Sequence, residues 1–468
     1  MAHPDKYKRH PRKRPELHRQ ISEEELMEKK RQSFSEMRPR AAELEEFFNR
    51  FSDMPREVIV KEDVLRLGVS FSQAALDATP GCRVKSYRLF SYDSVKMDDM
   101  QRQEASSVPE DMKMFAGPYG LRRTFFATRY FPDSPYLIDV VDGQLVLKDE
   151  LSGRVIADVE YPPAPKYYSY TFDDGTRYRD VVPMVWDHVA FITAFRYCQY
   201  WGAKQECQFC DINSNARQLK KAGKRALSAP FKQIDQVAQV METIYKEQTD
   251  PDDRLTMFII SGGTILKTLD GKTEDEFYLG YLRAVREVVP HRVTCVIQTG
   301  PKPKDIMRQY RDLGMDAHNS NMEVWDQRLF NIINPGKSRV VGWENWVRTT
   351  CDAVDILGEG AVNPNFVCGV EMCKPYGFET VGEAVQSTSQ GLEHYMSHGV
   401  VPRFVSWARE WGSYLKNQPP VPLEFYVRIM RAHYEIWRKY GLPPVKGYGP
   451  MGAGYAIDAN SSFMDMEG

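Results

Sequence analysis

The sequence predicts an α/β protein whose main body is a partial (β/α)6 barrel. From residue 183 to residue 410, short apolar runs typical of strands alternate with segments whose apolar residues recur at helical spacing. Such alternation indicates parallel strands joined by right-handed helical crossovers. Six repeats fit a partial, TIM-like barrel better than an eight-stranded one. The expected strands are residues 188–195, 255–263, 291–300, 315–324, 362–371 and 401–408.

Amphipathic segments lie between the expected strands and predict the outer helices of the barrel. In a barrel of this kind the chemistry lies at the carboxyl ends of the strands, on the loops that lead into the helices. The expected helices are residues 231–248, 273–289, 303–313, 340–357 and 381–398.

Three further segments flank the barrel. Residues 1–55 read as a basic tail followed by a helical arm. Residues 56–182 predict an N-terminal α+β accessory domain, in which Asp142-Gly143 is a hairpin turn between two β-rich runs. Residues 411–468 predict a C-terminal helical extension that ends in a Gly-rich tail. The tail either frays or folds over the mouth of the barrel.

The composition excludes several classes of protein. The net charge of −2 provides no global field that would attract nucleic acid or a membrane surface. No apolar run approaches the roughly 18 residues of a membrane-spanning helix, and the N-terminus lacks the apolar core of a secretory signal. The basic residues 1–20 are better explained as a solvated tail than as a nucleic-acid contact. We therefore expect a cytoplasmic protein that binds neither nucleic acid nor a membrane.

Three of the eight cysteines gather within thirteen residues, directly after the first expected strand. Cys198, Cys207 and Cys210 are therefore expected on a loop at the mouth of the barrel. Thiolates hold iron–sulfur clusters, and three of them leave one iron of a four-iron cluster open to a small molecule. Two alternatives are a zinc site, whose fourth ligand could be His188, and buried thiols without a metal.

This loop resembles that of the radical S-adenosylmethionine (SAM) superfamily. That superfamily carries three cysteines after its first barrel strand, with an aromatic residue before the last one, and Phe209 stands at that position here. The first gap is eight residues, where the usual gap is three. A longer gap adds little loop-closure entropy. The resemblance implies a [4Fe–4S] cluster on Cys198, Cys207 and Cys210, with SAM bound at the open iron.

The resemblance also implies contacts to SAM from glycines at the ends of later strands. Gly262 and Gly263 end the second strand, where the superfamily's glycine pair meets the amino group of SAM. A side chain at Gly263 is therefore expected to block SAM while sparing the cluster. Gly369, on the fifth strand, falls where the superfamily passes its backbone against the adenine.

The fourth unit looks like the biotin-synthase branch of the superfamily. Asn319, Asn321 and Glu323 alternate, which predicts that they share one face of a strand. By resemblance, Asn321 and Glu323 contact the ribose or the methionyl part of SAM. Arg339, together with Lys337, is a weaker candidate for its carboxylate.

The function implied by the resemblance is reductive cleavage of SAM at the cluster. The resulting 5′-deoxyadenosyl radical would abstract hydrogen from a small organic substrate, so the protein would be an oxidoreductase, a transferase or a lyase. A flavodoxin or ferredoxin would supply the electron, and the chain could form a homo-oligomer. Neither a cobalamin-binding signature nor a cysteine-rich extension is visible. The alternative is a non-catalytic iron–sulfur or zinc protein on the same scaffold.

Overall fold

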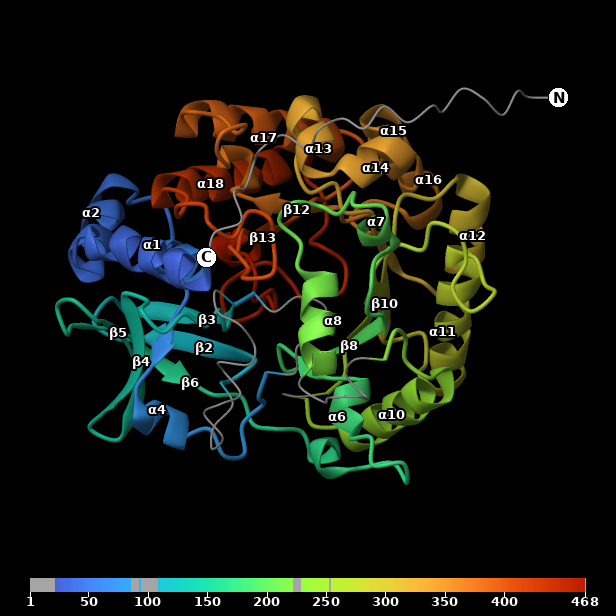
Figure 1. The fold of residues 1–468 in the computed structure, drawn as a ribbon, viewed down its shortest axis with the longest axis horizontal. Coiled ribbons are helices and arrows are strands. Elements are labelled where there is room, and N and C mark those ends of the chain that lie inside the picture. Colours follow the sequence, from blue (N-terminus) through green and yellow to red (C-terminus); the bar gives the residue numbers. More distant parts are fainter. Residues whose placement is uncertain (1–21, 86–91, 94–107, 222–228, 252–253, 468) are drawn as a thin grey trace.

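The computed structural model describes residues 22–85, 92–93, 108–221, 229–251 and 254–467 (Figure 1). The predicted basic tail, residues 1–20, lies outside these described residues. No helix among them is both long enough and apolar enough to cross a membrane.

Six parallel strands follow one another in chain order and confirm the predicted partial barrel. The first four pair side by side in one sheet, and the last two form a parallel pair. Parallel bridges from His318 to Val362 and from Glu323 to Phe366 join the two groups. The strands are β8 (Val189–Phe195), β9 (Met257–Gly262), β10 (Thr294–Gln298), β11 (Ala317–Asn319), β12 (Asn365–Cys368) and β13 (Arg403–Ser406). In the described part of the chain β13 pairs with β12 alone, so the barrel is open along that side.

Helices cover the outside of this sheet (Figure 1). Two of them begin with a capping box, at Thr273 with Glu276 and at Thr380 with Glu383, which satisfies backbone donors of the first turn. The main outer helices are α10 (Ile234–Glu247), α11 (Glu274–Val288), α12 (Lys304–Asp312), α15 (Trp343–Asp352) and α17 (Val381–Met396). Four further helices lie between the strands and these outer helices: α7 (Gln199–Gly202), α8 (Ile212–Lys221), α13 (Gln327–Ile333) and α14 (Pro335–Val340). A short helix, α16 (Val354–Leu357), follows α15 and leads to β12.

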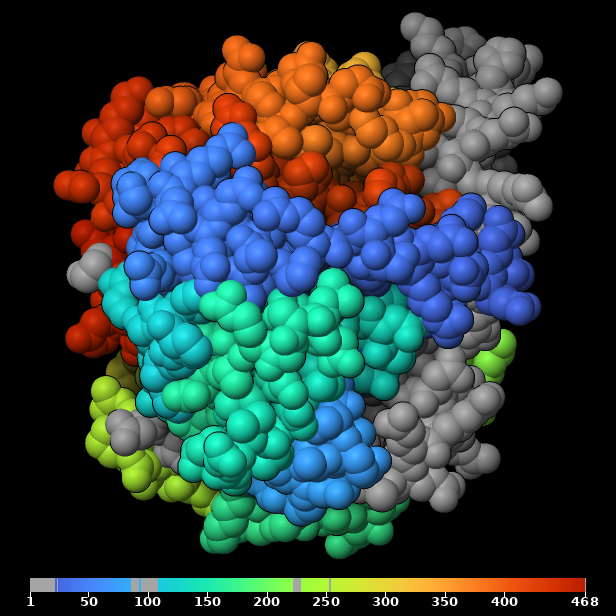
Figure 2. Space-filling view, turned by 90° about the vertical axis from the view of Figure 1, so that its left-hand side faces the viewer, coloured from blue at the N-terminus to red at the C-terminus, as the bar shows by residue number. Residues whose placement is uncertain are grey.

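The accessory region is a six-stranded sheet in the order β1-β4-β5-β6-β2-β3. Asp142 and Gly143, both with positive φ, make the turn between β4 and β5, as the sequence predicts. Its strands are β1 (Ser70–Phe71), β2 (Asp111–Ala116), β3 (Leu121–Ala127), β4 (Tyr136–Val141), β5 (Gln144–Asp149) and β6 (Val155–Glu160). Figure 2 shows the N-terminal helices α1 (Glu23–Ser35) and α2 (Arg40–Arg50) as a band between this sheet and the C-terminal helices. The next helix, α3 (Arg56–Leu67), is buried along almost its whole length.

The Gly-rich tail follows α18 (Leu423–Tyr440) and packs between the accessory sheet and the barrel. A Cβ on Gly447 would meet the side chains of Met257 and Thr294, which are the first residues of β9 and β10. The tail therefore begins at the amino ends of the barrel strands, whereas the cysteine loop follows the carboxyl end of β8. It then reaches β13, where the Asn460 carbonyl accepts a hydrogen bond from Ser406 N at 3.0 Å. The tail is therefore packed rather than frayed, and it touches the carboxyl end of β13 at Ser406.

Two buried ion pairs fix this tail to both neighbours. Lys61 of α3 pairs with Asp465 at 2.7 Å, and Arg403 of β13 pairs with Asp458 at 2.9 Å. One continuous apolar core runs from the arm through the accessory sheet to the barrel. The four segment boundaries given by the sequence stay a prediction, because the segments share this core.

Candidate metal and cofactor site

The three clustered cysteines lie on the loop that follows β8, as expected. All seven residues of β8 are buried, and Cys198 comes three residues after its end, as the N-cap of α7. Cys210 N donates a hydrogen bond to the Cys207 carbonyl at 3.1 Å, which makes a tight turn before α8. All three are free thiols; Cys210 is buried and the other two are partly exposed.

A single amide side chain closes the long gap between the first cysteine and the other two. Asn213, three residues after Cys210, accepts a hydrogen bond from Cys198 N at 2.8 Å and donates one to the Cys198 carbonyl at 3.3 Å. Both backbone groups of the first cysteine are therefore attached to the start of α8. This contact explains how an eight-residue gap can hold the three thiols on one loop.

Gln199 ties the same loop to the loop after β9. Its backbone N–H donates to the Thr264 carbonyl at 2.9 Å. Its side-chain oxygen accepts from Leu266 N at 2.7 Å and Lys267 N at 3.1 Å, and its amide nitrogen donates to the Thr268 carbonyl at 3.1 Å. The cysteine loop thus has four polar attachments to its neighbour.

The electrostatics of the thiols show that they lie near one another. Burial raises the pKa of each of the three thiols. The pKa of Cys207 rises to about 12. The charges of Cys207 and Cys198 raise the pKa of Cys210 further, and Lys337 lowers the pKa of Cys198 and of Cys207. A metal centre bound by these residues would displace their protons, because the thiolate is the form of cysteine that ligates a metal.

A zinc ion fits this loop poorly. A single zinc ion holds sulfur about 2.3 Å away, and hence its sulfur ligands within about 4 Å of one another. The three sulfur atoms do not form a group with all members within 4.8 Å of one another. His188, the suggested fourth ligand, precedes β8, whereas Cys198 follows it. Seven strand residues at about 3.3 Å each separate them by roughly 20 Å, so His188 cannot complete the site.

Lys337 and Glu323 form a buried ion pair next to the cysteines. Lys337 Nζ lies 2.6 Å from the Glu323 carboxylate and donates to the Asn321 carbonyl at 2.7 Å. Glu323 raises the pKa of Cys207 while Lys337 lowers it, which places both charges within reach of that thiol. In return, Glu323 and the thiolates of Cys207 and Cys198 raise the pKa of Lys337.

A curated sequence is similar to this chain. The bacteriochlorophyllide c C-7(1)-hydroxylase of Chlorobaculum limnaeum is 24% identical over 280 residues, which are 58% of this chain and 65% of that protein. The match spans less than two thirds of the length of this relative. No protein-family model matches the chain.

Three solved structures overlap with part of this chain. Methylornithine synthase (PylB) is 13% identical with a TM-score of 0.39, over 57% of this chain and 71% of that chain. HydG, a maturase of the [FeFe]-hydrogenase, is 8% identical with a TM-score of 0.39, over 55% and 51% of the two chains. Coproporphyrinogen III oxidase (HemN) from Escherichia coli is 12% identical with a TM-score of 0.34, over 60% and 59%.

The glycine at position 263 has a structural role beside the cysteines. A Cβ added there would lie 1.9 Å from the Tyr197 carbonyl oxygen and 2.6 Å from both Cα and Cβ of Cys198. Its N–H donates to the Phe195 carbonyl at 3.1 Å, and its carbonyl accepts from the Tyr278 hydroxyl at 3.1 Å. A side chain at 263 would therefore displace Cys198, which speaks against the expectation that it would spare the cluster.

Asn319, Asn321 and Glu323 do not share a regular strand face, contrary to the prediction. β11 ends at Asn319, and Glu323 has a φ of 72°, so the alternation of a strand is broken between them. Asn321 Oδ1 instead accepts from Asn365 N at 3.2 Å. Lys337 is buried beside the thiols, whereas Arg339 is exposed and its charge acts on Tyr200 of the cysteine loop.

The remaining residues predicted to bind SAM surround the same end of the barrel. Phe209 is buried between the second and third cysteines. A Cβ on Gly262 would meet the Tyr278 hydroxyl at 2.5 Å, and one on Gly369, whose φ is 109°, would meet the Tyr426 hydroxyl at 2.5 Å. Sequence reasoning missed Asn213 altogether; its only signal is its position just after the last cysteine.

Proposed function

We propose that this protein is a radical SAM enzyme that binds a [4Fe–4S] cluster on Cys198, Cys207 and Cys210 and cleaves SAM reductively. The observation that carries the proposal is the double hydrogen bond of Asn213, which holds the first cysteine beside the segment of the other two.

The residues around the thiols have distinct roles in this proposal. Lys337 offers a buried positive charge to the carboxylate of SAM, and Glu323 offers an acceptor to its hydroxyl or amino groups. The Asn365 side-chain oxygen is buried and has no hydrogen-bond partner in the described part of the chain, so it offers an acceptor to a ligand at the strand ends. Gly262, Gly263 and Gly369 keep the backbone free of side chains along the same rim, and Phe209 excludes water from the thiols. When bound, the cluster supplies the electron that splits SAM into methionine and a 5′-deoxyadenosyl radical.

The substrate in this proposal is a small organic molecule. The similar hydroxylase is named for its action on a bacteriochlorophyllide, and the match covers only part of that protein, so a tetrapyrrole is one substrate to assay among others. Flavodoxin or ferredoxin is the proposed electron donor, in the cytoplasm, and a homo-oligomer is compatible with the proposal.

Anaerobic reconstitution tests the proposal directly. The wild type should hold about four irons and four sulfides per chain and should form 5′-deoxyadenosine from SAM with dithionite. Cys198→Ala, Cys207→Ala and Cys210→Ala should each lose both properties. Cys82→Ala is the matched control, because Cys82 is a buried thiol of the accessory region.

Each contrary result has a definite meaning. A full cluster with no SAM cleavage would point to the non-catalytic iron–sulfur alternative. Stoichiometric zinc on the three cysteines, or loss of the cluster in the Cys82 variant as well, would refute the proposal.

A further inference from the structure

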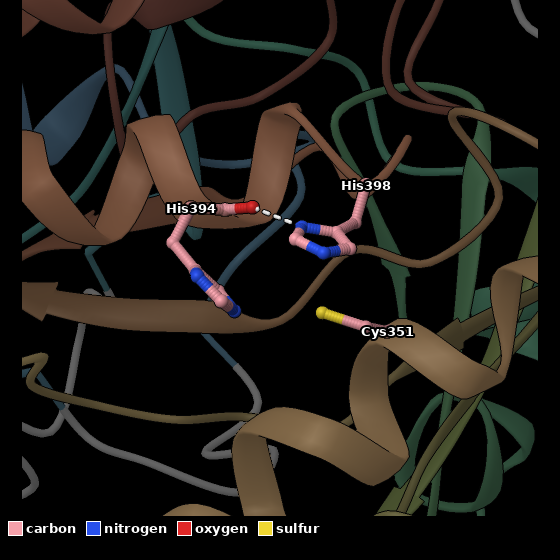
Figure 3. Close-up of side chains that lie close together, drawn as sticks. All are labelled: Cys351, His394 and His398. Carbon is pink, nitrogen blue, oxygen red and sulfur yellow. Dashed lines mark hydrogen bonds between the residues drawn. The ribbon is translucent and has the colours of Figure 1, made fainter.

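A second group of metal-ligand side chains lies on the outside of the barrel. Cys351 is in the last turn of α15, His394 is in the last turn of α17, and His398 follows two residues after α17 ends. One ligand atom of each lies within 4.8 Å of those of the other two, and Figure 3 shows the three side chains converging. Among the described residues this is the only such group of three or more His, Cys, Asp or Glu side chains.

The His398 ring is already oriented as a metal ligand. Its Nδ1 lies 2.7 Å from the His394 carbonyl oxygen, which can only accept, so Nδ1 carries the proton and Nε2 keeps its lone pair (Figure 3). Histidines that bind metals commonly donate their other ring N–H to a backbone carbonyl in this way.

The second histidine lies on the same face and is held by packing. The four-residue spacing of His394 and His398 puts both rings on one side of the chain, with their centroids 4.7 Å apart. The His394 ring also packs against the ring of Trp325 at 5.4 Å between centroids. Neither ring nitrogen of His394 has a hydrogen-bond partner within the ranges that the structure describes.

One thiol and two imidazoles make a donor set that suits zinc among the common metal ions. Zinc takes sulfur at about 2.3 Å and nitrogen at about 2.0 to 2.1 Å, so the three ligand atoms, which lie within 4.8 Å of one another, would have to approach by about 1 Å to share one ion. We propose that Cys351, His394 and His398 bind one Zn²⁺, with water as the fourth ligand on the side where His398 is exposed.

A zinc ion at this place would connect two outer helices. Cys351 belongs to α15, which precedes β12, and the histidines belong to α17, which precedes β13. The ion would therefore clamp neighbouring barrel units together from outside. The cysteines of the loop after β8 take no part, so this site does not depend on the proposed function.

Metal loading of the reconstituted protein tests the site. With the loop cysteines occupied by iron, the protein is incubated with Zn²⁺, desalted and analysed for zinc and iron. The wild type should retain about one zinc per chain beyond its iron, and Cys351→Ser and His398→Ala should each lose it. Co²⁺ loaded in place of Zn²⁺ should give a thiolate-to-metal absorption that is absent in Cys351→Ser.

Controls separate this result from the proposed function and from misfolding. His291→Ala removes an exposed histidine outside the group and should keep the zinc. The iron content and the 5′-deoxyadenosine yield of Cys351→Ser should equal those of the wild type. His398 is exposed, so its variant should fold even if the cysteine variant does not. A wild type without retained zinc, or a His398 variant that keeps it, overturns the proposal.

Discussion

Replacing Gly263 by alanine should displace the first cysteine of the loop. The added Cβ would lie 1.9 Å from the Tyr197 carbonyl oxygen, whereas ordinary contacts begin at 3.4 Å. The difference, 3.4 − 1.9, means that the two backbones must separate by about 1.5 Å. Both are backbone segments, so no side-chain rotation can relieve the overlap.

The attachments of the loop determine what that displacement costs. Gln199 bonds the cysteine loop to the residues directly after Gly263, so the two segments can separate only by breaking those bonds. Overpacking of this kind costs about 1 to 3 kcal/mol of stability. A catalytic group misplaced by about 1 Å loses roughly 100-fold in rate. We therefore expect both a labile cluster and a drop in SAM cleavage of at least that order.

The assay compares Gly263→Ala with Gly202→Ala. Gly202 lies in α7 of the same loop, and a Cβ there meets nothing within 4 Å and needs no positive φ. Iron per chain, the rate of iron loss to a chelator and the yield of 5′-deoxyadenosine are measured for both. Equal values for the two variants would refute the reasoning, because the overlap at 263 would then have no consequence.

Three further predictions concern single side chains. Asn213→Ala removes both hydrogen bonds to Cys198, which together contribute about 1 to 3 kcal/mol. The variant should therefore lose iron to a chelator faster than the wild type. An unchanged rate would show that the Asn213 amide does not hold the loop. Lys337→Met should raise the KM for SAM. It should also lower the free energy of unfolding, measured with denaturant, by about 3 to 5 kcal/mol, because the buried carboxylate of Glu323 loses its partner. Arg339→Met, at an exposed site, should change the free energy of unfolding by no more than about 0.5 kcal/mol. Glu371 is buried, and burial raises its pKa from 4.5 to about 7. The folded state therefore binds its proton more tightly, and stability falls as pH rises from about 4.5 to about 7. Glu371→Gln should therefore raise the free energy of unfolding by roughly 3 kcal/mol at pH 8, from 2.5 pKa units at 1.36 kcal/mol each, and leave it unchanged at pH 4. A stabilisation that does not vary with pH would contradict this.

The barrel could be predicted from the sequence because its strands are buried on both faces. Such strands appear as continuous apolar runs, and all six were found. The fourth was predicted over residues 315–324, yet β11 covers only Ala317–Asn319. The positive φ of Glu323 depends on its bridge to β12, which no local pattern contains.

The cysteines of the site could be predicted, but the residues that hold them could not. The spacing of Cys207 and Cys210 is local and visible, whereas the contact of Asn213 with Cys198 exists only in the folded loop. The sequence predicts Gly263 as a contact to SAM, and the structure adds its close packing against Tyr197 and Cys198. A sequence shows that a side chain is absent, but not which neighbour occupies the space.

The C-terminal tail carries the counter-charges of two separate parts of the molecule. Asp465 neutralises Lys61 in the accessory region, and Asp458 neutralises Arg403 in the barrel. Removal of the tail by a protease cut before these aspartates would leave a buried cation unpaired in each part at once. That loss of stability would add to the loss of the tail's apolar contacts. The two parts would then lose their stability as one unit, although neither had been cut.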